Sequence, residues 1–461
     1  MDAGTHSQKD VILITVDSLR ADFVFDGPEV IDSLPTLDSL HQMSTTFSNA
    51  FSNAGFTKSS FLSIFSGTYP WMFESVQGGF GPDRPHVAEQ FSEAGYETGG
   101  FHSNPYLDTD YGYDRGFDYY MGRDKGEEMD KATFSSEAWQ FITRRIGSDR
   151  LSDGIRNLYQ SVGSNLGIQI GGDPYLNAED INDSVVRWVD QTDGPKFIWV
   201  HYMDVHTPYY PHEGTVSEDI SKRRAVKLFH RVHDQRGDAS EDDIDLLRRL
   251  YRGELQYLDR CLGDLLDDLG HHLDLNESIL AFSSDHGEAF NEHGHVFHPD
   301  GVQYDELVHI PLLVNGPDFD TTTVDTPVSN IDLVPTLLSA ANHPIPESCM
   351  GDDLRSLAAD PPDDRIVFTE GYTEVDGRIM ATSGDYKLIQ YLNDGQSFLY
   401  DRVDDPKERH NCIDKKPDVR DRLHTAVDEH IQMVRTHDGE SNNVEVNDEV
   451  KDRLRRLGYA E

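Results

Sequence analysis

Hydrophobic residues in this chain occur either in short continuous runs or at the spacing of a helix, and the two patterns alternate. Four mostly apolar runs predict strands that are buried on both faces: residues 11–16, 197–200, 279–282 and 310–314. Leucines recur near a 3.6-residue period over residues 242–269, which predicts a long helix that ends at Gly270. A second helix is predicted over residues 331–341. This alternation indicates an α/β fold.

From about residue 365 the pattern changes to short alternating segments. They predict a small antiparallel sheet with strands at residues 366–370, 378–382, 386–391 and 397–400. An amphipathic helix is predicted over residues 417–434. We therefore expect a large α/β domain over residues 1–364, a C-terminal α+β subdomain over residues 365–434, and a polar linker with a short terminal helix over residues 435–461. Residues 124–177 are polar and weakly patterned, which indicates an insertion or lid.

The charge of the chain adds a prediction about its surroundings. Its 461 residues include 84 Asp and Glu against 40 Lys and Arg, so the formal net charge is −44. The acids are spread along the whole chain, and only 12 of the basic residues are lysine. Such a surface suits a cytosol of molar salt, where the Debye length falls to ~3 Å and self-repulsion is screened. We interpret the chain as a halophilic protein, with an ordinary acidic protein as the alternative.

The same acidity excludes several partners. It disfavours binding to nucleic acid or to an anionic membrane surface. No apolar run reaches the ~18–20 residues that a membrane span requires, and the polar residues 1–10 lead into the first predicted strand without a signal peptide. We therefore expect a cytoplasmic location. Cys261, Cys349 and Cys412 are too few and too far apart for a disulfide framework or a zinc knuckle.

Polar residues that could take part in catalysis or in metal binding follow three of the predicted strands. They are Asp17, His201 and Asp285. Because ligands bind beyond the carboxyl ends of the strands in open α/β sheets, we expect these residues to line one site. His286 follows Asp285, and a carboxylate with an imidazole suits Mn²⁺, Mg²⁺, Ca²⁺ or Zn²⁺ without choosing among them. The alternatives are a helix N-cap for Asp17 and packing at a strand end for His201.

Further histidines lie close to these strand ends. His206 stands in the loop after the second strand, and His293, His295 and His298 follow Asp285. A histidine beside a cleft can protonate a leaving group or bind an oxyanion, so His206 and His298 are candidates for catalysis. For His293 and His295 a structural or supporting role is the equal alternative.

A hydroxyl-rich segment, residues 53–70, predicts the start of another helix. A hydroxyl there lies where backbone N–H groups and the helix dipole favour an anion, and a nearby metal would lower the cost of an alkoxide further. Thr57 is the candidate nucleophile. The alternative is that Thr57 or Ser59 only caps the helix.

Six motifs in order resemble the sulfatase family of the alkaline phosphatase superfamily. They are ITVDSLRAD, GFTKSSFLSIFSGTYP, HYMDVHTPYYP, SSDHGEAFNEHG, NIDLVPTLL and GDYKLI with FLYDRVDDPKERHN, and together they extend from about residue 10 to residue 434. The resemblance implies an alkaline-phosphatase-like central mixed β-sheet flanked by helices. It also implies a smaller C-terminal domain with a four-stranded antiparallel sheet, and one divalent metal ion at the strand ends.

The resemblance also implies roles for individual residues. Asp17, Asp285 and His286 match metal ligands, and Thr57 falls at the nucleophile position, where it would also contact the metal. His206 matches a substrate-binding histidine, and His298 falls where sulfatases keep an active-site lysine. The remaining residues expected on the substrate side are Lys58, Asn104 and His201.

The departures from the family concern the residues that contact sulfate. Typical sulfatases have Cys or Ser, then Pro two positions later and Arg four positions later, and the cysteine becomes formylglycine. Here the run from Thr57 to Phe61 reads TKSSF, and threonine cannot become formylglycine. Ser18 replaces the second aspartate of the usual pair, and Ser103-Asn104-Pro105 replaces a Lys-x-His segment. Threonine nucleophiles occur in related phosphodiesterases, phosphatases and phosphoglycerol transferases.

These observations predict a metal-dependent hydrolase or transferase that acts on a sulfate or phosphate ester of a small molecule or glycan. Thr57 would be the metal-activated nucleophile, and His206 or His298 would protonate the leaving oxygen. The alternative is a sulfatase-like protein that only binds a sugar or an anionic ligand. The natural substrate, the choice between sulfate and phosphate, the metal and the oligomeric state stay open.

Overall fold

The computed structural model describes residues 8–25, 31, 33–74, 79–121, 175–235, 239–299, 301–372 and 377–436. The predicted insertion at residues 124–177 and the predicted linker and terminal helix at residues 435–461 lie outside the described residues except at their edges. Both remain predictions.

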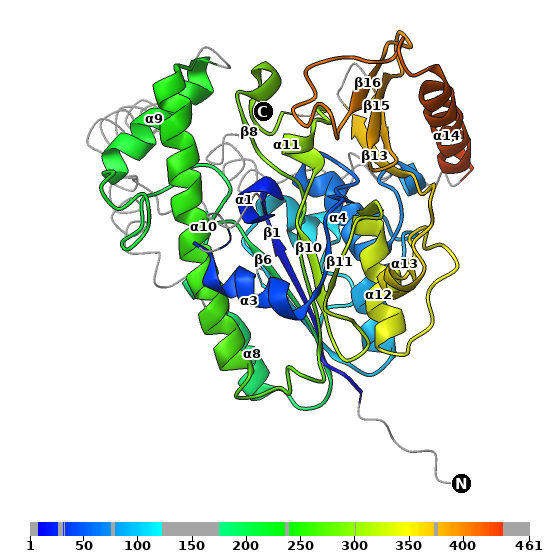
Figure 1. The fold of residues 1–461 in the computed structure, drawn as a ribbon. Coiled ribbons are helices and arrows are strands. Elements are labelled where there is room, and N and C mark those ends of the chain that lie inside the picture. Colours follow the sequence, from blue (N-terminus) through cyan, green and yellow to red (C-terminus); the bar gives the residue numbers. More distant parts are fainter. Residues whose placement is uncertain are drawn as a thin grey trace, which may run out of the picture.

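The core of the protein is an eight-stranded mixed sheet, as expected. Its strand order is β11-β2-β10-β7-β1-β6-β4-β5. The strands are β1 Val11–Val16, β2 Thr45–Phe47, β4 Glu97–Phe101, β5 Tyr119–Tyr120, β6 Lys196–Tyr202, β7 Ile279–Ser284, β10 Leu312–Asn315 and β11 Thr322–Val324. Strand β1 pairs in parallel with both β6 and β7, whereas β10 runs antiparallel to β7. The carboxyl ends of β1, β6 and β7 therefore lie at one edge of the sheet (Figure 1).

Several of the predicted strand boundaries differ from the structure by one or two residues. Strands β6 and β7 extend to Tyr202 and Ser284, because every residue of β1 has a partner in both neighbours and the ladder continues past the apolar runs. His201 consequently lies within β6 and not after it. Strand β10 begins at Leu312 and not at residue 310, since Pro311 has no N–H for a ladder hydrogen bond.

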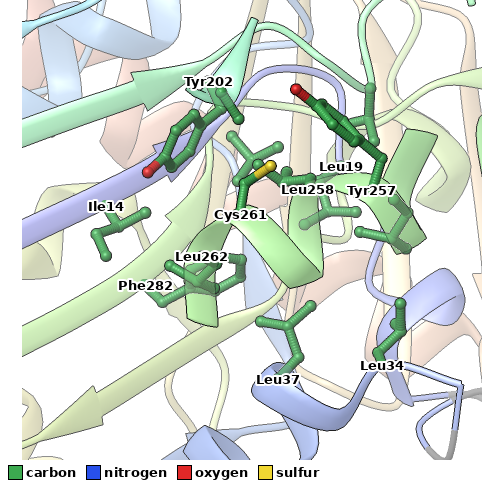
Figure 2. Packing of buried hydrophobic residues seen from close by; sticks show 14 of the residues in the cluster. Ile14, Leu19, Leu34, Leu37, Tyr202, Tyr257, Leu258, Cys261, Leu262 and Phe282 are labelled. Atoms are coloured by element: carbon green, nitrogen blue, oxygen red, sulfur yellow. The ribbon is translucent and has the colours of Figure 1, made fainter. Parts of the chain in front are cut away.

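Helices cover both faces of the sheet (Figure 1). On one face Ile12, Ile14 and Val16 of β1 pack toward the helices α3 Pro35–Met43, α8 Ala178–Gln191, α9 Lys222–Gln235 and α10 Glu241–Leu269. On the other face Val11 and Leu13 pack toward α4 Thr57–Ser66, α5 Val87–Glu93, α12 Leu333–Ala340 and α13 Leu354–Ala359. Figure 2 shows residues of the first core, where Leu262 of α10 lies beside Phe282 of β7. Side chains of β1 point alternately to the two faces, and helices cover both. Every position of β1 is therefore buried, which explains its uninterrupted hydrophobic run.

The long helix predicted over residues 242–269 is confirmed as α10. The helix predicted over residues 331–341 begins with a 3₁₀ turn, Asn330–Asp332, and continues as α12. The short elements are α1 Asp22–Phe25, β3 Ala50–Phe51, β8 Ala289–Phe290, β9 Val296–Phe297, α11 Asp305–Val308, β12 Val328–Ser329 and 3₁₀ turns at Met72–Glu74, Pro105–Leu107, Thr109–Tyr111 and Glu292–Gly294. Within the described ranges every helix is too short or too polar to span a bilayer.

The predicted C-terminal sheet and helix are also present. Strands β13 Val367–Tyr372, β14 Gly377–Thr382, β15 Tyr386–Tyr391 and β16 Ser397–Asp401 form an antiparallel sheet in sequence order, and α14 Pro417–Arg435 follows. Ile379 and Leu388 face Leu423 and Val427 of α14, whereas Met380 faces the large domain. This alternation is the reason for the period-two pattern in the sequence. The boundary at residue 365 stays a prediction.

Candidate functional site

Two carboxylates meet at the carboxyl ends of the adjacent strands β1 and β7. Asp17 follows β1 and Asp285 follows β7, and both side chains are fully buried. Ser18 between them has a left-handed backbone, with φ of 62°. Its N–H donates to Oδ1 of Asp285 at 3.1 Å, and its hydroxyl donates to Oδ1 of Asp17 at 2.8 Å. Ser18 thus holds the two carboxylates together.

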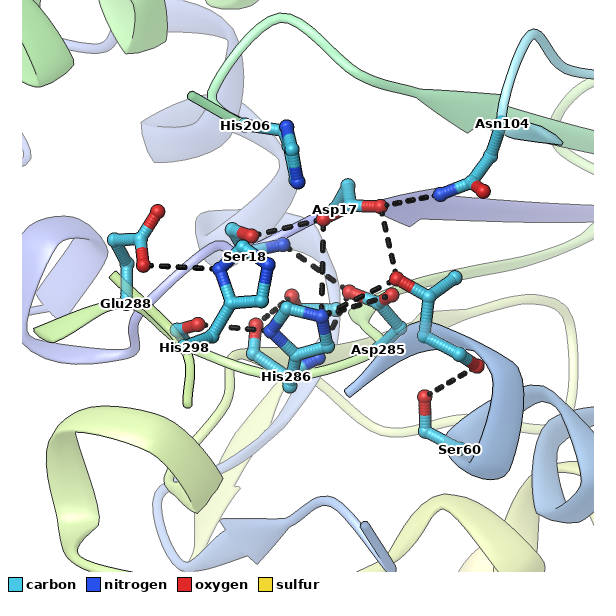
Figure 3. A network of polar contacts seen from close by, with 12 residues as sticks. Asp17, Ser18, Ser60, Asn104, His206, Asp285, His286, Glu288 and His298 are labelled. Atoms are coloured by element: carbon cyan, nitrogen blue, oxygen red, sulfur yellow. Dashed lines mark hydrogen bonds and ion pairs between the residues drawn. The ribbon is translucent and has the colours of Figure 1, made fainter. Parts of the chain in front are cut away.

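Thr57 and His286 complete this cluster (Figure 3). The Thr57 hydroxyl donates to Oδ2 of Asp17 at 3.2 Å and lies 3.3 Å from Nε2 of His286. The same Nε2 is 3.5 Å from Oδ2 of Asp285 and 3.8 Å from Oδ1 of Asp17. The structure therefore brings together all four residues that were predicted to surround a metal.

The hydrogen bonds of this cluster fit a cation. Nδ1 of His286 is 2.8 Å from the carbonyl of Gly287, which can only accept, so the ring proton is on Nδ1 and Nε2 presents a lone pair. Oδ2 of Asp285 is buried and has no hydrogen-bond partner among the described residues. A lone pair and several carboxylate oxygens thus face one another, an arrangement that a cation stabilises. Carboxylates with an imidazole are a donor set for a divalent metal.

The two carboxyl groups differ in their electrostatics. Burial raises the pKa of Asp17, but the nearby histidines, His206 first, hold it well below its ordinary value. Burial and then the charge of Asp17 raise the pKa of Asp285. A dication beside both groups would favour the ionised form of each.

The local structure excludes the capping alternatives for Thr57 and Asp17. Thr57 is the first residue of α4, whose N-cap is Phe56, and no side chain caps the helix. The Thr57 hydroxyl points into the cluster instead. Asp17 lies well before α1, which begins at Asp22, and its carboxylate interacts with the cluster.

Two histidines lie beside the cluster. The ring of His298 is 4.8 Å from that of His286 and 5.0 Å from that of His206. Burial lowers the pKa of His298, but the Glu288 carboxylate, 3.1 Å from Nδ1, raises it to about 9. Burial lowers the pKa of His206 to about 4. At neutral pH His298 is therefore a cation and His206 is neutral.

Sequence reasoning missed the role of Glu288. This carboxylate is fully buried, faces His298 and accepts a hydrogen bond from Tyr209 at 2.7 Å. The only signal was its place in the SSDHGE motif, which does not reveal its partner. The role of Ser18 was missed in the same way, because it was considered only as a lost aspartate.

The three residues predicted on the substrate side have different surroundings. Asn104 donates to Oδ2 of Asp17 at 2.8 Å, so its amide already has a partner in the cluster. His201 is buried, with Nε2 3.4 Å from the same oxygen. The Lys58 ammonium lies over the ring of Tyr111, 4.3 Å from the centroid, and burial lowers its pKa to about 8. None of the three roles is tested by this geometry.

The mixed sheet thus carries a buried cluster of carboxylates, imidazole and hydroxyl at its carboxyl edge. The family model for sulfatases matches residues 9–343, and the model for the C-terminal part of N-sulphoglucosamine sulphohydrolase matches residues 292–436. The chain belongs to the sulfatase family, which confirms the membership expected from its motifs.

Curated relatives match part of their own length. An uncharacterized sulfatase of Escherichia coli is 28% identical over 246 residues, which cover 51% of this chain and 48% of the relative. An ulvan-active sulfatase of Formosa agariphila is 28% identical over 257 residues, which cover 52% of this chain and 48% of the relative. The chain thus matches about half the length of these two relatives.

Solved structures extend the likeness over almost the whole chain. A protein in complex with its substrate D-glucosamine-2-N,6-O-disulfate has a TM-score of 0.68 at 16% identity and covers 94% of this chain and 99% of its own. The phosphonate monoester hydrolase of Silicibacter pomeroyi has a TM-score of 0.66 at 19% identity and covers 96% and 98%. These likenesses establish the fold, and they confirm the predicted α/β architecture.

Proposed function

We propose that this protein is a metal-dependent hydrolase that cleaves a sulfate or phosphate ester of a carbohydrate, with Thr57 as the nucleophile. The observation that carries the proposal is the position of the Thr57 hydroxyl, 3.2 Å from Asp17 and 3.3 Å from Nε2 of His286 at the start of a buried helix. The name of the ulvan-active sulfatase, and the disulfated sugar bound in the similar structure, support a carbohydrate ester.

Asp17, Asp285, His286 and Thr57 would hold the metal ion. When bound there, a dication lowers the pKa of a neighbouring hydroxyl and neutralises charge on the ester. The helix start adds favourable dipole energy for an anion at Thr57. Thr57, having lost its hydroxyl proton to water, would form a bond to sulfur or phosphorus as the bond to the sugar oxygen breaks. Water would then attack the same atom, break its bond to Thr57 and return a proton to the threonine oxygen.

His298 is the better candidate for protonating the leaving oxygen. It is a cation at neutral pH because Glu288 raises its pKa to about 9, whereas His206 is neutral. A cation with a proton to give serves as the acid. His206 lies above Asp17 in Figure 3 and is suited to bind the substrate. Because Asp17, Thr57, Asp285 and His286 are retained and lie together, we favour the enzyme over the binding-only alternative.

The test is an activity panel with purified protein at high KCl. It compares aryl sulfate, aryl phosphate, phosphodiester and phosphonate esters, and then sulfated sugars, each with Mg²⁺, Mn²⁺, Ca²⁺ or Zn²⁺ after chelation. We expect turnover of a sulfate or phosphate ester that chelation abolishes and one metal restores. Metal-independent turnover contradicts the mechanism, and binding of a sulfated sugar without turnover of any ester contradicts the enzymatic function.

We also propose that the protein works in a cytoplasm of high salt. The proposal rests on its net charge of −44 with only 12 lysines. Dense carboxylates repel one another unless salt screens them.

A further inference from the structure

His201 occupies a place in the site that its predicted role does not explain. It lies in β6, is fully buried, and has Nε2 3.4 Å from Oδ2 of Asp17. Ligand atoms of Asp17, His201 and Asp285 all lie within 4.8 Å of one another. Nε2 makes no hydrogen bond of normal geometry with any part of the chain that the structure describes. This buried ring nitrogen therefore faces a carboxylate of the cluster without a hydrogen bond to it.

The other ring nitrogen determines which tautomer is present. Nδ1 of His201 is 3.0 Å from the Thr15 hydroxyl oxygen. That oxygen accepts from the Trp199 indole at 3.0 Å, and its own proton points to the carbonyl of Val200 at 3.3 Å. The Thr15 oxygen is thus left to accept from Nδ1–H, and Nε2 carries a lone pair. A metal-binding histidine commonly has its second nitrogen held in this way.

The ring is also fixed by packing. Its centroid is 4.9 Å from that of Phe61, nearly edge-on at 83°, and 5.9 Å from that of Trp199. These contacts already hold Nε2 toward the carboxylates, so binding a metal would cost little further side-chain entropy.

The distances within the cluster match those between donors of one ion. Two donors that are each about 2.1 Å from a metal, at angles of about 90–110°, lie about 3.0–3.4 Å apart. Nε2 of His201 is 3.4 Å from Asp17, Thr57 is 3.2 Å from Asp17, and His286 is 3.3 Å from Thr57. The two oxygens of Asp17 thus lie next to different imidazoles, Oδ2 next to His201 and Oδ1 next to His286 at 3.8 Å, and the carboxylate can join both rings at one ion.

We propose that His201 is a direct ligand of the metal and not a substrate-binding residue. This inference rests on the metal of the proposed function. The donor set then contains two imidazoles, His201 and His286, with the carboxylates of Asp17 and Asp285. Ser18 has no carboxylate to add, and its hydroxyl donates a hydrogen bond to Asp17. Two nitrogen donors favour Zn²⁺ or another transition metal over Ca²⁺ and Mg²⁺, which prefer oxygen.

The test counts imidazole ligands by X-ray absorption spectroscopy of the zinc-loaded protein. The wild type should show two imidazoles, His201→Gln should show one, and the matched control His206→Gln, another buried histidine of the same site, should keep two. Zinc affinity, measured by chelator competition, should fall more than about 100-fold in His201→Gln, because even the loss of an outer partner of a ligand costs about 10–100-fold.

Each outcome separates the two proposals. One imidazole in the wild type, or two in His201→Gln, overturns the role of His201 but leaves the proposed function intact. Failure of the wild type to bind any of the four metals overturns the proposed function itself. If His201→Gln does not fold, the wild-type imidazole count decides the question alone, and a larger rise of the melting temperature with Ca²⁺ than with Zn²⁺ also counts against His201.

Discussion

Replacing Thr57 by alanine separates a nucleophile from a structural hydroxyl. The change removes a hydroxyl that lies beside both Asp17 and His286, and leaves the other predicted ligands in place. If Thr57 attacks the ester, kcat should fall by about 10³–10⁶-fold, while substrate binding weakens much less. A 10⁴-fold loss corresponds to about 5.5 kcal/mol of transition-state stabilisation.

The expected loss of folding stability is much smaller. Thr57 is 1% exposed, so the lost methyl group costs about 1 kcal/mol and the lost hydrogen bond to Asp17 about another. The higher helix propensity of alanine returns about 0.5 kcal/mol. We therefore expect a net loss of about 1–2 kcal/mol, measured by urea unfolding in high KCl.

Ser60→Ala is the matched control. Ser60 is buried one turn further along α4, and its hydroxyl donates to the Thr57 carbonyl at 3.2 Å. It should lose about 1 kcal/mol of stability and keep its turnover. Mass spectrometry after an acid quench should find the transferred group on the peptide that contains Thr57 in the wild type. A near-wild-type rate in Thr57→Ala would refute the reasoning and mean that water attacks the ester directly.

Three further changes test the metal, the pH dependence and the salt dependence. Asp285→Asn should abolish turnover and shrink the rise of the melting temperature that a bound metal produces, and an unchanged rise removes Asp285 from the ligands. Burial, and then the charge of Arg115, lower the pKa of His86 to about 3. In the unfolded chain this histidine binds a proton near pH 6.5, whereas in the folded protein it stays neutral down to about pH 3. The folded state therefore loses stability as the pH falls from about 6.5 toward 3. The variant His86→Asn tests this, because its side chain can still accept from the Ala88 N–H at the start of α5. The free energy of unfolding that the wild type loses between pH 7 and pH 5 should be smaller in this variant by roughly 2 kcal/mol, measured by urea unfolding. An equal loss in both proteins contradicts this account. The melting temperature should rise steeply from low to molar KCl, and a flat or falling curve argues against a halophilic protein.

The chain's local patterns predicted much of its architecture. Residues 11–16 are apolar throughout because β1 has helices on both faces, and α10 follows the leucine period because only one of its sides faces the sheet. The C-terminal strands alternate because one face packs on α14 and the other on the large domain. In each case the periodicity records burial, which is local to the element.

The motifs predicted which four residues would share a site, but only the tertiary structure decided which of their atoms and which other polar side chains contact one another. Asp17 and Asp285 are far apart in the chain and meet because β1 and β7 are neighbours in the sheet. No local pattern links Glu288 to His298, or turns Nε2 of His201 toward Asp17. The sequence could place each residue at the end of a strand or the start of a helix. Which side chains then share a hydrogen bond, a charge or a metal depends on strand order and register, and these follow from contacts between distant segments that periodicity does not encode.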